Sequence, residues 1–263
     1  MTTWLLTHFS LWQLAALIIG GTTVVAMAGC ALVRRRFPTL TEGTYNELSG
    51  VLLGIFAAIY GVLLAFVVVI QWESRGQAAD AVAAEAAALG QAVQDGQGLA
   101  PGPRNAVQAA IGGYLHTVVG QEWPSMSRGT ASPAATAALD RVFATVREAN
   151  PRTDAENVYY SDLVSSLNQA STSRRTRLAA SGEGLPGLLG ALLVAGAVVF
   201  VPLTYLFGIR RPAAQFAFVA FCGTLVAVGL FLTVVLDRPF AGGLGLDPGA
   251  FEQGTLARYW PTP

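Results

Sequence analysis

The sequence predicts an all-α integral membrane protein with four transmembrane helices and an extramembrane helical domain inserted between the second and third. Three observations lead to this fold class. Only 12% of the 263 residues are charged, whereas 53% are hydrophobic. Four long stretches carry no Asp, Glu, Arg or Lys at all. The remaining segments show the apolar spacing of amphipathic helices, and no alternating strand-like run is present.

The four uncharged stretches are the predicted transmembrane helices. They comprise residues 11–33, 48–72, 185–209 and 212–236. A helix needs about 20 apolar residues to cross a hydrocarbon core of roughly 30 Å, and each stretch exceeds that length. We therefore expect a multi-pass protein of the cell membrane whose main partner is the lipid bilayer.

Residues 73–184 form the predicted extramembrane helical domain. The first part of this segment, residues 73–93, is rich in alanine, the strongest helix former, so the second membrane helix should continue into water. Three further helices are expected, over residues 104–122, 134–149 and 154–181. Residues 237–263 remain as a C-terminal tail.

The composition excludes several functional classes. The 16 basic residues, all arginines, balance 16 acidic residues, so the chain lacks the basic excess of a nucleic-acid-binding protein. Two cysteines are too few for a disulfide scaffold. His8 and His116 are isolated in the sequence, whereas a metal site needs clustered ligands. No catalytic motif is present, so we expect no metal, no cofactor and no enzymatic activity.

The arginines of the two short loops bear on orientation. Arg34, Arg35 and Arg36 lie between the first two membrane helices, and Arg210 and Arg211 lie between the last two. The opposite face also carries five arginines near the membrane ends. Because the short loops are brief, their density of positive charge favours a cytoplasmic position. The helical domain would then be extracytoplasmic.

A charged rim is expected where membrane helices two and four end and helix three begins, because these three points share one face. The rim comprises Glu73, Arg75, Arg174, Arg175, Arg177, Asp237 and Arg238. Two interpretations are open. The charges are ordinary interfacial groups with snorkelling arginines, or they form a vestibule that concentrates ions.

Small residues favour close packing of the membrane helices. Gly50 and Gly54 form a G-x-x-x-G pair, and Gly187, Ala191 and Ala195 repeat the same spacing. Such residues let helix backbones approach one another, within one chain or between copies. A homo-oligomer is therefore expected.

A set of short motifs extends from the end of the second membrane helix into the C-terminal tail. It includes Trp72, Glu85, Tyr114, Glu122-Trp123-Pro124, Met126, Arg174, Arg177, Leu236-Asp237-Arg238-Pro239-Phe240 and Phe251. With these motifs the chain resembles a bacterial bestrophin-like family of integral membrane proteins, a domain family of unknown function. The resemblance implies similarity to bestrophins, which are pentameric anion channels, at the level of the fold.

Two functional hypotheses follow. The first is an oligomeric passive channel, with anions as the expected ions. The membrane stretches lack the ionisable mid-depth groups typical of coupled pumps, and an apolar constriction can still gate a pore by dewetting. The alternative is a non-conducting membrane scaffold or sensor whose helical domain binds a partner or ligand.

Overall fold

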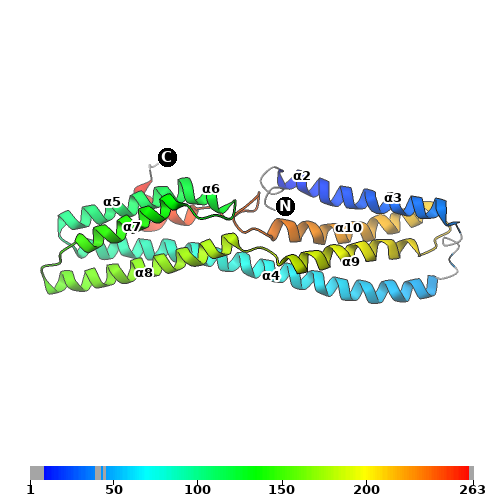
Figure 1. Cartoon of the computed structure of the whole chain (residues 1–263), viewed down its shortest axis with the longest axis horizontal. Helices are drawn as coiled ribbons and strands as arrows, with labels where there is room; N and C mark the ends of the chain where they lie inside the picture. The colour runs from blue at the N-terminus through cyan, green and yellow to red at the C-terminus, as the bar shows by residue number, and fades with distance from the viewer. Residues whose placement is uncertain (1–8, 39–42, 44–45, 261–263) are drawn as a thin grey trace. The chain divides into compact units, whose positions relative to one another are not determined.

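The computed structural model describes residues 9–38, 43 and 46–260 (Figure 1). Every regular element in this part of the chain is a helix, which confirms the all-α class. The chain divides into two compact units. Unit 1 comprises residues 1–73 and 185–237, and unit 2 comprises residues 74–184 and 238–263.

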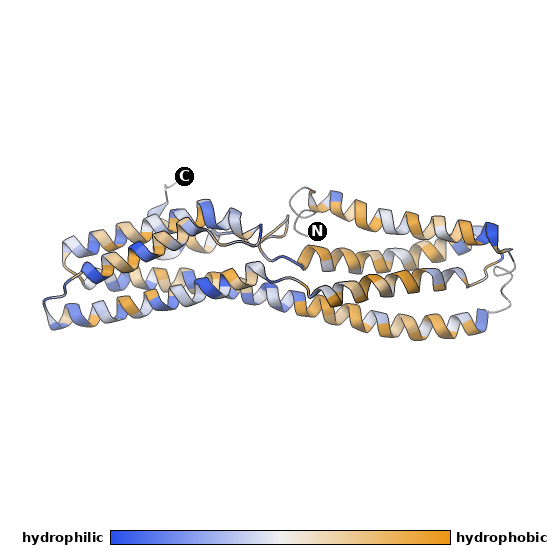
Figure 2. Ribbon diagram, in the orientation of Figure 1, coloured by the Kyte–Doolittle hydropathy of each residue, from blue (hydrophilic) through white to orange (hydrophobic). Residues whose placement is uncertain are grey.

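Unit 1 contains four helices that are long and apolar enough to cross a membrane. They are formed by α2, η1 and α3 in direct succession (Leu11–Ala15, Ala16–Gly20, Gly21–Arg36), by the first part of α4 (Asn46–Asp95), by α9 (Gly187–Tyr205) and by α10 (Pro212–Leu236). Figure 2 shows their predominantly hydrophobic colouring. The predicted membrane stretches are confirmed as apolar helices, although their bounds differ. The first extends to Arg36, α4 begins at Asn46, and α9 runs from Gly187 to Tyr205, so that residues 206–211 form the turn into α10.

Helix α10 is the most enclosed of the four. In its most apolar window 44% of the residues are buried, against 11% in the first helix. Small residues allow this enclosure. A Cβ atom added at Gly223 would lie 3.2 Å from the Cβ of Ala26, and one added at Gly229 would overlap Leu64. Helices in lipid associate mainly through such close packing, since apolar contact alone gives them no advantage over lipid.

Tyr60 joins α4 to α9. Its ring packs against Gly196 and stacks on Phe200 at a centroid distance of 6.2 Å. Its hydroxyl donates a hydrogen bond to the carbonyl oxygen of Leu193 at 3.0 Å. The only polar atom of this side chain is therefore satisfied inside the bundle, as an apolar surrounding requires.

Unit 2 is a helical bundle built around the second part of α4. The other elements are η3 (Gly96–Gly98), α5 (Pro101–Thr117), η4 (Val118–Glu122), α6 (Trp123–Met126), α7 (Pro133–Glu148), α8 (Asp154–Gly182), η5 (Gly249–Glu252) and η6 (Gly254–Tyr259). The predicted continuation of the second membrane helix is confirmed, since α4 runs unbroken to Asp95. Ser132 and Thr153 cap α7 and α8 by accepting hydrogen bonds from the backbone.

The C-terminal tail is part of the unit 2 core. Phe240, Phe251 and Leu256 are buried among the helical side chains of the bundle. Trp260 closes the segment by donating its indole N–H to the carbonyl oxygen of Phe251 at 2.8 Å. The tail is thus ordered because it contributes large apolar side chains to the core.

The contact between Tyr60 and Gly196 generates a stability prediction. The Gly196→Ala substitution places a methyl group against the Tyr60 ring, and overpacking of this kind lowers the free energy of unfolding by about 1–3 kcal/mol. Gly190→Ala is the matched control on the same helix, because its added Cβ atom meets its nearest neighbour at 3.7 Å. Unfolding of both variants in detergent micelles measures the difference, and equal stability would contradict this packing.

Candidate functional site

Unit 2 buries two arginines and two glutamates in its interior. Glu85 lies on α4, Glu122 ends η4, and Arg174 and Arg177 lie on successive turns of α8. Arg177 and both glutamates are 0% exposed, and Arg174 is 6% exposed. Charges removed from water in this way are tolerated only when each is paired and hydrogen-bonded. We call these four residues, together with Tyr114, the buried charge cluster.

Arg177 is the centre of the cluster. Its Nε and Nη2 atoms donate to the two carboxylate oxygens of Glu85 at 2.7 and 3.1 Å. The same Nη2 atom donates to Glu122 Oε2 at 2.8 Å. The planar guanidinium thus holds one carboxylate as a two-pronged fork and joins it to the second.

Arg174 and Tyr114 complete the pairing. Arg174 donates from Nε and Nη2 to the two oxygens of Glu122 at 3.1 and 2.5 Å. The Tyr114 hydroxyl donates to Glu85 Oε1 at 2.6 Å. Two positive and two negative side chains therefore satisfy one another in an interior from which water is excluded.

Aromatic rings cover the cluster on the side of the C-terminal tail. The guanidinium carbon of Arg177 lies 5.5 Å from the ring centroid of Trp123 and 5.7 Å from that of Phe251, within the range of a cation–π interaction. Trp123 also donates its indole N–H to the carbonyl oxygen of Leu246 at 2.9 Å. The tail is therefore attached directly to the residues that surround Arg177.

The surroundings fix the protonation of the cluster. Burial would raise the pKa of the Glu122 carboxyl, but hydrogen bonds and positive charge from Arg174 and Arg177 outweigh burial and lower this pKa. Burial would lower the pKa of Arg177, but the charges and hydrogen bonds of the two glutamates raise it. Burial, followed by the negative charge of Glu85, raises the pKa of Tyr114 well above its usual value. Glu122 and Arg177 therefore stay charged at neutral pH while Tyr114 stays neutral.

A comparison with known protein families finds a match over most of the chain. Residues 20–251 match the Bestrophin-like domain. The chain belongs to the bestrophin-like family. Together with the four apolar helices, this membership makes it a multi-pass membrane protein. No curated protein and no solved structure is significantly similar to it.

The motifs that carried the family resemblance meet around Arg177 in this bestrophin-like chain. Glu85 binds it, Trp123 covers it, and Phe240 packs edge-to-face on Trp123 at a centroid distance of 5.5 Å. Pro124 lies in the first turn of α6, and the carbonyl oxygen of Pro239 accepts the backbone N–H of Leu246 at 2.8 Å. Trp72, by contrast, is 67% exposed at the end of the apolar part of α4.

The expected charged rim is corrected for two of its members. Arg174 and Arg177 are buried inside unit 2, where Glu122 and Glu85 balance their charges. Glu73 and Arg175 are exposed.

The other three rim residues bind backbone atoms. Arg75 donates to Pro239 O at 3.5 Å in unit 2, and Arg238 donates to the carbonyl oxygens of Ser181 and Gly182 at 3.3 and 2.9 Å. In unit 1, Asp237 Oδ1 accepts the backbone N–H of Leu185 at 2.7 Å. Each of these three side chains therefore fixes a backbone segment within its own unit.

Tyr114 and Glu122 belong to the sequence motifs of the family resemblance, but the sequence did not predict that they lie in a site. A usable signal was present: charged residues stand at core positions of amphipathic helices. Glu85 lies between the buried Val82 and Leu89 on α4, and Arg174 continues the buried series of Leu167 and Ala170 on α8. A charge at such a position requires a buried counter-charge, which spacing alone cannot identify.

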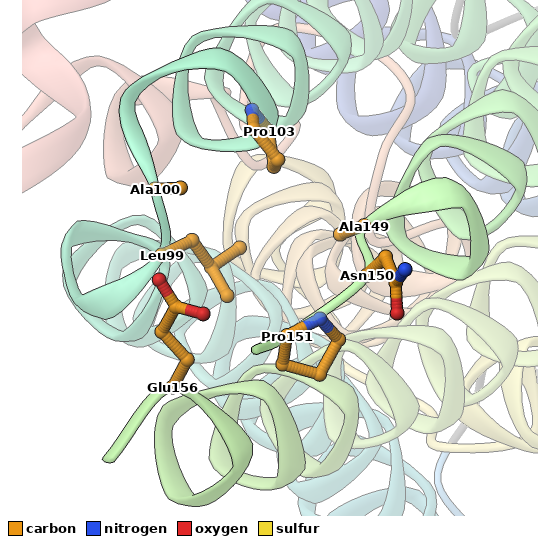
Figure 3. Close-up of a pocket in the computed structure, with 7 residues that line it drawn as sticks. All are labelled: Leu99, Ala100, Pro103, Ala149, Asn150, Pro151 and Glu156. Carbon is orange, nitrogen blue, oxygen red and sulfur yellow. The ribbon is translucent and has the colours of Figure 1, made fainter. Parts of the chain in front are cut away.

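The described surface of unit 2 includes a small pocket and a larger groove. Figure 3 shows a small pocket between the α4–α5 and α7–α8 connections, lined by Leu99, Ala100, Pro103, Ala149, Asn150, Pro151 and Glu156. The Glu156 carboxylate already accepts the backbone N–H of Arg152 at 2.6 Å, so it serves the start of α8. A larger groove of about 430 Å³ lies between α4 and the C-terminal segment, with Ala87, Gly90 and Gly254 in its lining.

No metal centre is found in the described part of the chain, where no group of three or more His, Cys, Asp or Glu side chains gathers. His8 lies outside the described residues. His116 makes an edge contact with Trp260 at a centroid distance of 4.5 Å. The buried charge cluster is thus the main polar assembly of unit 2, and its geometry suits it to holding helices together.

Arg177 should be essential for the stability of unit 2. The Arg177→Leu substitution leaves the buried Glu85 and Glu122 without their shared partner, and we expect a loss of about 3–5 kcal/mol in the free energy of unfolding. Arg175→Leu, on the exposed face of the same helix, should change it by less than about 0.5 kcal/mol. Denaturant titration of the full-length protein followed by tryptophan fluorescence measures both. Equal losses of unfolding free energy in the two variants would show that the ion pairs do not stabilise unit 2.

The lowered pKa of Glu122 makes stability depend on pH. Since the folded pKa lies below the unfolded value of about 4.3, the carboxylate stabilises the folded state above pH 4.3. This contribution is lost as the pH falls from there through the folded pKa. Glu122→Gln should flatten this part of the stability profile, whereas Glu148→Gln, exposed on α7, should not. Unfolding measured across acidic pH tests the difference; an unchanged slope in Glu122→Gln would contradict it.

Proposed function

We propose that the chain is the subunit of a homo-oligomeric passive ion channel of the cell membrane. In this proposal unit 1 spans the bilayer, and unit 2 is an extramembrane domain inserted between the second and third membrane helices. Membership of the bestrophin-like family supports the channel class. We place the ion path between copies of the chain rather than through the centre of one copy.

The packed interior of unit 1 is the observation that carries the proposal. Tyr60, Val67, Leu193, Phe200 and Val226 form a buried cluster between α4, α9 and α10. An ion path inside one chain would have to displace these apolar side chains and would meet few polar groups. A path along an axis shared by several copies avoids this cost.

Helix α4 is our candidate for the helix that lines the axis. Its apolar part carries a row of large exposed side chains spaced alternately by four and three residues: Leu48, Leu52, Ile55, Ile59, Val62, Phe66 and Val69. This spacing is typical of helices that pack against a parallel copy with a left-handed supercoil. A narrow apolar passage of this kind can close by dewetting.

We propose anions as the permeant species and an extracytoplasmic position for unit 2. The resemblance to bestrophins, which are anion channels, supports anions as the permeant species. The charged groups of the buried charge cluster bind one another as well as Thr136 and Met126, which supports a non-enzymatic role.

The alternative function is a non-conducting scaffold or sensor. The groove between α4 and the C-terminal segment supports it, because a volume of about 430 Å³ is within the range of small-molecule sites. Gln94 bridges the groove by donating to the Thr255 hydroxyl at 3.2 Å. Ligand capture without conductance would favour this alternative.

Conductance in proteoliposomes tests the proposal. We expect the purified protein to pass chloride. Phe66→Ser, in the α4 row, should raise the current severalfold, because a polar side chain stabilises water in an apolar constriction. Val25→Ser, at an exposed apolar position of α3, is the control and should leave the current unchanged. Silence across anions, cations and voltages would contradict the channel proposal.

A further inference from the structure

The short-loop end of unit 1 presents a strongly basic surface. Arg34, Arg35 and Arg36 end α3, and Arg210 and Arg211 lie in the turn between α9 and α10. In the sequence, residues 31–49 and 206–215 carry five arginines and two acidic residues, Glu42 and Glu47. The positive charge here is therefore concentrated at the ends of the membrane helices.

The guanidinium of Arg34 is not part of the outward-facing charge, because it binds atoms of the α9–α10 turn and of α10. It donates to the carbonyl oxygens of Ile209 and Arg210 at 3.2 and 3.3 Å and to the side-chain oxygen of Gln215. Gln215 is 1% exposed and donates in turn to the carbonyl oxygen of Phe207 at 3.3 Å. The end of α3 is thereby fixed to the α9–α10 turn.

Asn46 fixes the same turn from the start of α4. Its side chain donates to the carbonyl oxygen of Gly208 at 2.8 Å and accepts the backbone N–H of Gly208 at 2.7 Å. Two helices therefore hold the turn in one conformation. A turn held in this way presents its side chains without a further cost of ordering the backbone.

The remaining four arginines are exposed, two at the end of α3 and two in the α9–α10 turn. They are Arg35, Arg36, Arg210 and Arg211. Within the described part of the chain, none of the four forms an ion pair, since the recorded salt bridges all lie in the buried charge cluster. Exposed apolar side chains, Leu32 at 67% and Phe37 at 54%, lie beside them on the same helix end.

We propose that this surface binds the phosphate headgroup of an anionic membrane lipid. A guanidinium group matches phosphate oxygens with two parallel hydrogen bonds. Arginines at the ends of membrane helices lie at the depth of the headgroups, and Leu32 and Phe37 are placed to contact the acyl chains. Arg34 is the positioning residue that brings the two arginine pairs together. The proposal rests on the membrane assignment alone and is independent of channel activity.

Lipid selectivity of the full-length protein tests the proposal. The protein is titrated in detergent with phosphatidylglycerol or phosphatidylcholine, and bound lipid is counted by native mass spectrometry. We expect a preference for phosphatidylglycerol that falls by about fivefold for each arginine removed in the series Arg35→Gln, Arg36→Gln, Arg210→Gln and Arg211→Gln. The matched control removes four exposed arginines of unit 2: Arg128→Gln, Arg141→Gln, Arg147→Gln and Arg152→Gln.

The control should keep the full preference for phosphatidylglycerol. If both variants lost the preference for phosphatidylglycerol equally, net charge alone would explain it, and the proposed site would be wrong. A preference retained by the variant without the four basic side chains would overturn it as well. Inorganic phosphate, added at constant ionic strength, should not displace the lipid; displacement would identify a site for free phosphate instead.

Discussion

The buried guanidinium of Arg177 is the constraint on which unit 2 depends. An unpaired charge in this interior would cost several kcal/mol, so the packed position of α8 is stable only with Glu85 and Glu122 beside Arg177. These partners come from α4 and η4, and the covering Phe251 comes from the C-terminal segment. Segments far apart in the sequence therefore converge on one side chain. This convergence explains why the C-terminal tail packs in unit 2, because unit 2 contains Arg177 and Trp123, the side chains that the tail contacts.

The two units are held together by different forces. Unit 2 excludes water from a core of aliphatic side chains and places ion pairs within it. Unit 1 lies in lipid, where apolar contact alone gives little gain, and instead uses small residues and a few buried hydrogen bonds. Gln71 donates to the carbonyl oxygen of Thr233 at 2.9 Å, and the hydroxyls of Thr23 and Thr224 lie 3.1 Å apart. These bonds join α4 and α3 to α10 without placing a charge inside the bilayer.

Family membership and geometry bear on function in complementary ways. The bestrophin-like match gives the class of membrane protein. In the described part of unit 1, apolar side chains fill the space between α4, α9 and α10, which is why our proposal places the ion path between copies. The arginine surface at the short-loop end is our proposed contact between unit 1 and an anionic lipid. An assembly of such subunits would then depend on lipid composition as well as on helix packing.

The sequence by itself determined the helical class, the four apolar helices, the unbroken course of α4 and the helix breaks before α5, α7 and α8. These features are local: hydrophobic length, helix propensity and capping residues act within a few turns. The helix expected over residues 104–122 instead begins at Pro101 and continues through η4 and α6 to Met126. Only the tertiary structure decided that Arg174 and Arg177 lie inside the bundle while Arg175, between them, faces outward. Their partners Glu122 and Glu85 are 52 and 92 residues away in sequence. Helical spacing assigns a charge to a face of its own helix, but the counter-charge that makes burial favourable is supplied by another helix.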